Sequence, residues 1–154
     1  MSTGMGLTEA VRALLLLLPR VIGRAKKAKI PDELSCFSLA PRHLSLFSYL
    51  QFDGPMPVNE LASRLQVAPA TVSLMVSELS RKGLLERHED EKDRRRTIVS
   101  IAPARQDAVE QWIASTARAW QAAMEPLTDE QRKFFVDTLA RFERELNAED
   151  RDRA

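Results

Sequence analysis

The segment VNELASRLQVAPATVSLMVSEL, residues 58–79, restricts the fold of this chain more than any other part of the sequence. Two helices that are joined by a tight turn and cross steeply need a small residue where the second helix passes over the first. Ala62 suits that crossing. The positions that must be apolar in such a pair are all apolar here, namely Leu61, Leu65, Val67, Val72 and Met75. The spacing therefore predicts a helix-turn-helix.

The second helix of this pair has clear signals at both ends. Pro69 suits the first position of a helix, where its missing N–H is not needed, and Gly83 suits the position after the last turn. The residues between the apolar positions are small or polar: Ala70, Thr71, Ser73 and Ser77. This pattern predicts an outward face slim enough to enter the major groove of DNA.

Two short strands are predicted directly after this helix, at residues 84–88 and 97–101, with a charged turn between them. The turn carries Lys92, Asp93 and the run Arg94-Arg95-Arg96. A helix-turn-helix followed at once by a two-stranded flap with an arginine tip is the pattern of a winged helix. Because arginine is drawn into the narrow, electronegative minor groove of A·T-rich DNA, the pattern predicts a protein that binds double-stranded DNA.

Helices are predicted on both sides of this winged region. Apolar residues at helical spacing predict one helix from Leu7 into the basic run at 24–29, one at 42–52, and one at 103–126. The last helix has the clearest start, a capping box from Thr128 to Gln131, and its tail is expected to fray past Asn147. The predicted fold class is mainly α with a small β-hairpin wing, a winged helix-turn-helix with further helices at both ends.

Charge and composition limit the function classes without choosing one. The net charge is +1, and residues 55–102 carry eight Lys and Arg against seven acidic residues, so DNA binding has to rest on where the charges lie. The longest apolar run is far shorter than the ~20 residues that cross a bilayer, and Glu9 and Arg12 interrupt any signal peptide. The single cysteine, Cys36, suits a reducing compartment. We expect a cytoplasmic protein with no membrane partner.

The chain resembles the MarR family of bacterial transcription regulators. The matching residues are Glu60-Leu61-Ala62, the segment LSRKGLL at 79–85, Arg87, and Asp93-Arg94-Arg95 followed by the strand around Val99. The resemblance implies a homodimer built from residues 1–40 and 103–154, with residues 41–102 as the winged helix-turn-helix DNA-binding domain. It also implies a pseudo-palindromic operator and repression that a small aromatic or anionic effector relieves.

The resemblance also gives roles to residues of the wing. In such proteins Arg95 reaches into the minor groove and Asp93 holds it in place. Arg94 and Arg96 are expected on the opposite side of the strand from Arg95, where they suit phosphates. The residues expected to contact DNA are Arg64, Pro69, Ala70, Thr71, Ser73, Leu74, Ser77, Lys92, Arg94, Arg95 and Arg96.

Three positions depart from the family pattern. Leu74 stands where the family often has an arginine, Ala68 where it usually has a polar N-cap, and Pro57 where it usually has a polar residue. Ala68 has no side-chain oxygen for an end amide, so the helix end could instead face a phosphate. With few side chains able to make bidentate hydrogen bonds to bases, specificity is expected to depend on thymine methyl groups and on DNA shape.

A possible effector pocket is formed by Phe37, Arg42, His43, Phe47 and Trp112, for which core packing is the alternative interpretation. His43 and His88 are far apart in sequence, and no cluster has the spacing of a zinc site, so no metal and no cofactor are expected. Cys36 has no second cysteine to resolve a sulfenic acid. We interpret it as a packed or idle thiol, with redox sensing as the alternative.

No Gly-rich phosphate loop, HExxH segment or nucleophile elbow occurs in the sequence, and an enzyme is not predicted. Two alternatives stay open beside the DNA-binding regulator. The winged helix could serve protein contact inside a larger assembly, for which Leu74 is a hint, or the chain could be a small enzyme with an unrecognised site.

Overall fold

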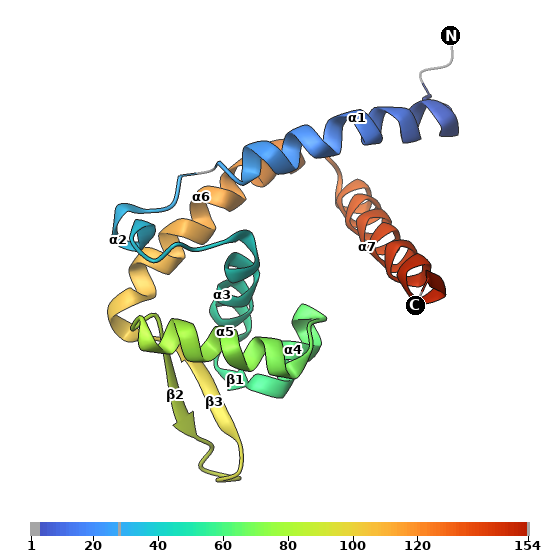
Figure 1. Ribbon diagram of the computed structural model, residues 1–154. Helices are drawn as coiled ribbons and strands as arrows, with labels where there is room; N and C mark the ends of the chain where they lie inside the picture. The colour runs from blue at the N-terminus through green and yellow to red at the C-terminus, as the bar shows by residue number, and fades with distance from the viewer. Residues whose placement is uncertain (1–3, 28, 154) are drawn as a thin grey trace. The chain divides into compact units, whose positions relative to one another are not determined.

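The computed structural model describes residues 4–27 and 29–153. They form two compact units, which divide between Thr116 and Ala117. Residues 1–3, 28 and 154 of the predicted dimerisation region and basic run lie outside the described residues. The elements follow in the order α1 (Leu7–Ala25), α2 (Asp32–Ser35), α3 (Pro41–Asp53), β1 (Met56–Pro57), α4 (Val58–Leu65), α5 (Pro69–Arg81), β2 (Leu85–Glu89), β3 (Thr97–Ile101), the 3-10 turn η1 (Pro103–Arg105), α6 (Gln106–Met124) and α7 (Asp129–Arg153) (Figure 1). This order confirms the predicted fold class.

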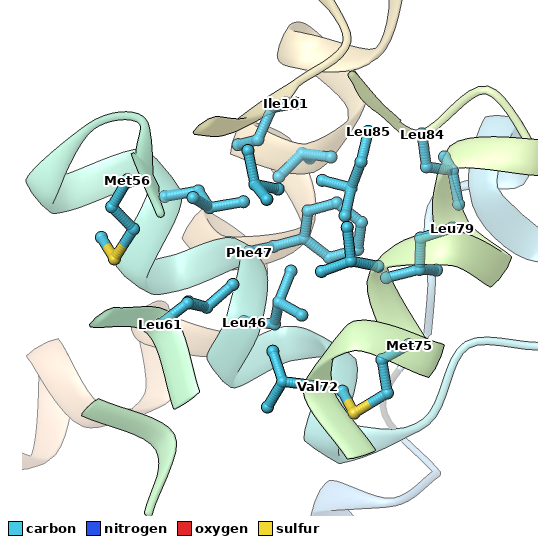
Figure 2. Packing of buried hydrophobic residues seen from close by; sticks show 14 of the residues in the cluster. Leu46, Phe47, Met56, Leu61, Val72, Met75, Leu79, Leu84, Leu85 and Ile101 are labelled. Carbon is cyan, nitrogen blue, oxygen red and sulfur yellow. The ribbon is translucent and has the colours of Figure 1, made fainter. Parts of the chain in front are cut away.

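The crossing of α4 and α5 is packed as the sequence predicts. Ala62 is 2% exposed at the crossing, and Leu61 and Val72 are completely buried beside it. Figure 2 shows side chains from α3, α4, α5 and the strands meeting around Phe47 in one core. Val67 departs from the pattern, because the turn between the helices leaves its side chain 38% exposed.

A third strand, which the sequence did not predict, joins the wing. The sheet order is β1-β3-β2, with Met56 opposite Val99 and Pro57 opposite Ile98. Two residues are too few for an alternating apolar pattern to reveal a strand. Pro57 can stand there because β1 is an edge strand, where a missing N–H costs little.

The passage from α5 into the wing is a tight backbone motif. The Gly83 N–H donates to the carbonyl of Ser80 at 3.0 Å, and the Leu84 N–H donates to the carbonyl of Leu79 at 2.9 Å. This is a Schellman motif, which needs a residue with positive φ after the helix, and Gly83 has a φ of +73°. Leu84 and Leu85 then enter the core, so the base of the wing is anchored directly to the end of α5.

The C-terminal elements differ from the prediction at their ends. The capping box of α7 is confirmed, since the Gln131 N–H donates to Thr128 Oγ1 at 3.2 Å and the Thr128 N–H donates to Gln131 Oε1 at 2.9 Å. The predicted fraying past Asn147 is wrong, because α7 continues to Arg153. The tail after Asn147 includes Ala148, Glu149, Arg151 and Arg153, which favour a helix, and it has neither Gly nor Pro to stop one. None of the described helices is both long and apolar enough to cross a membrane.

Candidate nucleic-acid interface

The two faces of α5 differ sharply in burial. Its inner face packs into the core with Val72, Met75, Val76 and Leu79. Its outward face carries Ala70, Leu74, Ser77 and Arg81, which recur at helical spacing on one side. Leu74 is 73% exposed. Pro69 is at the start of the helix, as predicted, and Ala68 is an N-cap without a side-chain hydrogen bond. The amides of the first turn are therefore available to an anion.

The turn at the tip of the wing is closed by its own acidic residues. The Asp93 carboxylate accepts the backbone N–H of Arg95 at 3.1 Å, and the Asp90 carboxylate accepts the backbone N–H of Lys92 at 3.0 Å. The Asp90 N–H also donates to the carbonyl of Arg96 at 3.0 Å. Asp93 thus positions Arg95 through the backbone and leaves its guanidinium in solvent. Asp90, one of the acids before the arginine run, has a structural task in the same turn.

The three arginines of the tip lie in this turn, before β3 begins at Thr97. The expectation that Arg94 and Arg96 stand on the opposite side of a strand from Arg95 is therefore wrong, since alternation applies only within a strand. All three side chains are exposed, and so is that of Lys92. The tip presents a cluster of positive charge whose backbone is held by hydrogen bonds.

Arg87 joins the wing to the outward face of α5, and sequence reasoning did not select it. It lies on β2 opposite Val99, and its Nη1 donates to Ser77 Oγ at 3.3 Å. The match of Arg87 to the family segment was the signal that could have found it. Its neighbour on α5 is set by strand register and helix packing, which the sequence pattern does not show.

Comparison with known proteins identifies this domain. Residues 41–97 match the model of the MarR family. The segment 41–97 is therefore a MarR-family domain. Over 93 residues, 60% of each chain, it is 29% identical to the HTH-type transcriptional repressor MdtR of Bacillus subtilis. MarR-family proteins are transcriptional regulators that bind DNA. The family therefore confirms that the chain is not an enzyme and favours DNA binding over protein contact.

Solved structures with the same fold include complexes with DNA and with a small molecule. The S. aureus MepR–DNA complex has a TM-score of 0.61 and 23% identity, covering 82% of this chain and 93% of that one. NadR in complex with 4-hydroxyphenylacetate has a TM-score of 0.67 and 15% identity, covering 92% of this chain and 95% of that one. At these identities the similarity shows the winged-helix fold of MarR proteins.

Arg64, which lies within this MarR-family segment, is held by acidic neighbours. Its guanidinium is ion-paired with Asp53 of α3, and its Nη2 lies 2.8 Å from Glu60 Oε1. Tyr49 adds a hydrogen bond from its hydroxyl to the Arg64 carbonyl at 3.1 Å. These contacts tie α3 to α4. The role of Arg64 as a phosphate contact stays a prediction.

The five residues predicted to line an effector pocket lie in different environments. Phe47 is completely buried and packs edge-to-face against Trp112, with ring centroids 6.1 Å apart. Phe37 is half-buried under the guanidinium of Arg105, and Arg42 is exposed. Lys82 at the end of α5 donates to the Phe37 carbonyl at 3.0 Å. Phe47 and Trp112 thus serve the core, and a pocket of these residues stays a prediction.

His43 is the buried polar residue of this group, at 3% exposure. Its Nδ1 accepts the backbone N–H of Ala40 at 2.9 Å, so a neutral ring carries its proton on Nε2. Among the described residues, the buried Nε2 has no hydrogen-bond partner. Burial first, and then the positive charge of Arg42, lowers the pKa of His43 below its ordinary 6.5, while nearby Glu78 opposes the shift and Lys82 adds to it.

This shift predicts that His43 makes stability depend on pH. As pH falls through 6.5, the unfolded chain takes up a proton that the folded chain does not, so the free energy of unfolding should fall. The slope from this residue is at most about 1.4 kcal/mol per pH unit. Urea unfolding between about pH 7.5 and 5.5, above the carboxylate range, should show a weaker slope for His43→Gln than for the native chain. A slope in His43→Gln equal to that of the native chain would contradict the assignment.

Metal-ligating side chains and the cysteine are the remaining candidates for a sensing role. Among residues 4–27 and 29–153 there is no group of three or more His, Cys, Asp and Glu side chains that could hold a metal ion. Cys36 is a free, exposed thiol in the residue after α2. It is therefore not the packed thiol that one interpretation expected.

Proposed function

We propose that the protein is a homodimeric repressor that binds a pseudo-palindromic operator with two winged domains. In each domain α5 enters the major groove, Arg95 enters the neighbouring minor groove, and Lys92, Arg94 and Arg96 contact phosphates. The observation that carries this proposal is the exposed outward face of α5 together with the exposed arginine tip. Arg87 bridges the two elements through Ser77. A single surface of the domain therefore offers a helix for one groove and cations for the next.

The dimer is supported by apolar surface on both terminal helices. None of the described side chains of α1 is buried, although it carries five consecutive leucines, and Leu15 is 70% exposed. Helix α7 exposes Phe134 at 75% and Phe142 at 50%. Monomeric proteins rarely leave apolar patches of this kind in water. We infer that a second copy covers them, and this copy would also supply the second half of a palindromic site.

Repression and release by an effector are supported by relatives. MdtR, which resembles the chain, is named a transcriptional repressor, and NadR was solved with the aromatic acid 4-hydroxyphenylacetate. The buried Nε2–H of His43 lacks a partner among the described residues, so an effector carboxylate that reached it would satisfy this donor, and the positive charge of Arg42 acts on the same ring. We propose that an aromatic or anionic effector acts in this region.

The function predicts a steep dependence of binding on salt. Protein cations that contact phosphates release condensed counterions from DNA. The slope of log K against log salt is therefore about −0.9 per phosphate contact. Three to five contacts per subunit, six to ten per dimer, would lower the affinity by about 10³- to 10⁵-fold between 50 and 200 mM salt. The measurement is fluorescence anisotropy titration on a duplex found by footprinting the DNA upstream of the protein's own coding sequence. A salt-independent affinity would contradict groove binding.

The same footprint tests the effector. Repeating it with a panel of aromatic acids should reveal at least one that weakens protection, and this acid should lose its effect on His43→Gln. Protection that no acid changes would contradict the effector proposal and leave DNA binding intact.

A further inference from the structure

The outward face of α5 has an unusual composition for a helix that contacts bases. From Pro69 to Ser77 it has no charged and no amide side chain, and the first such residue is Glu78. Bidentate hydrogen bonds to a base edge need Arg, Lys, Asn or Gln. Thr71 and Ser73 offer only single hydroxyls. The first two turns of the helix therefore cannot distinguish bases in the usual way.

Leu74 dominates this part of the surface. It is the bulkiest apolar side chain on the outward face, it is 73% exposed, and its neighbours on that face are Ala70 and Ser77. The inner positions Val72 and Met75 fill the core. Leu74 therefore contributes no packing that would explain a large apolar side chain at this position.

Positive charge beside Leu74 shows what kind of partner covers it. The guanidinium of Arg87 is held at Ser77, three residues along the helix from Leu74, and Arg81 follows on the same face. An apolar side chain with guanidinium groups further along the same helix face suits a surface that has an apolar group in its floor and phosphates at its walls. The major groove has this form where a thymine presents its C5-methyl group.

We propose that Leu74 is a specificity-determining residue that contacts the C5-methyl group of one thymine in each operator half-site. This proposal rests on the proposed function, in which α5 enters the major groove. Ala70 and Thr71 each offer a single methyl group, so Leu74 presents the largest apolar surface among the outward residues of the first two turns. The contact is apolar, so it distinguishes thymine from a base without the methyl group.

Replacing thymine with deoxyuridine removes this methyl group alone and tests the contact. The duplex is the one that binds full-length protein best after repeated selection from a random library. Each thymine of its half-sites is replaced in turn, at both symmetric positions together. For the native protein, one position should lose about fourfold in affinity per half-site, the effect of burying roughly one methyl group. Other thymines should lose less.

The Leu74→Ala variant completes the test. It should bind the thymine duplex more weakly than the native protein does, and it should bind the thymine and uracil duplexes equally at the sensitive position. Leu74→Met should stay sensitive because its side chain is also long and apolar, and the matched control Ser73→Ala should keep the native sensitivity. Both replaced side chains are exposed, so the variants should fold, and sedimentation velocity can verify the dimer.

The outcomes separate this proposal from the proposed function. A native protein that binds but is indifferent to uracil at every thymine overturns the role of Leu74 and leaves the regulator intact. Equal sensitivity of Leu74→Ala and the native protein does the same. Failure to select any duplex overturns the proposed function and this proposal together.

Discussion

Replacing Arg95 with alanine is expected to lower operator affinity on the order of 10³-fold. A specific arginine contact is worth about 1–3 kcal/mol, and a dimer loses it in both half-sites. The expectation rests on an exposed guanidinium whose backbone is held by the Asp93 carboxylate at 3.1 Å. Because the side chain is exposed, the variant should keep its fold and its dimer. Anisotropy titration at one fixed salt concentration measures the loss.

A second duplex separates groove contact from simple charge. Changing the A·T pairs that face the wing to G·C widens the minor groove and should weaken the native protein. Arg95→Ala should be indifferent to that change. Arg94→Ala is the matched control: it should lose affinity equally on both duplexes and lower the salt slope by about one per phosphate contact removed. Native affinity in Arg95→Ala would contradict the assignment of the wing.

Replacing Phe47 with alanine is expected to cost about 3–5 kcal/mol of unfolding free energy. Phe47 is completely buried, packs edge-to-face on Trp112, and lies at the centre of the side chains in Figure 2. Its removal leaves a cavity among residues of α3, α5 and the strands, which relax only in part. Since domains of this size are stable by about 5–15 kcal/mol, the variant should be close to unfolding. Urea denaturation at constant protein concentration measures the change.

The matched control lies on the same helix. Phe52 is 72% exposed near the end of α3, so Phe52→Ala should change stability by less than about 0.5 kcal/mol. A loss of under 1 kcal/mol in Phe47→Ala, or an equal loss in both variants, would contradict the position of Phe47 in the core. A dimeric reference state is concentration-dependent, and both variants should be compared at the same concentration.

Much of the fold could be predicted because its signals are local. Pro69, Gly83 and the capping box at Thr128 act on residues within one turn. The helix starts and ends that they mark can therefore be predicted from neighbouring residues in the sequence. The apolar positions of the helix-turn-helix follow from helical periodicity, and Ala62 marks the crossing. β1 could not be predicted in this way, because its two residues form a strand only through pairing with Val99 and Ile98.

The candidate site also combines features that local sequence determines with contacts that only the tertiary structure determines. The sequence by itself determined the winged helix, the outward face of α5 and an arginine tip, since each depends on the order of residues within one element or turn. Only the tertiary structure decided that Arg87 meets Ser77, that Arg64 is paired with Asp53, and that Lys82 holds the carbonyl of Phe37. These partners are 10, 11 and 45 residues apart in sequence. Strand register and helix packing bring them together, and no periodicity within a single element encodes those two properties.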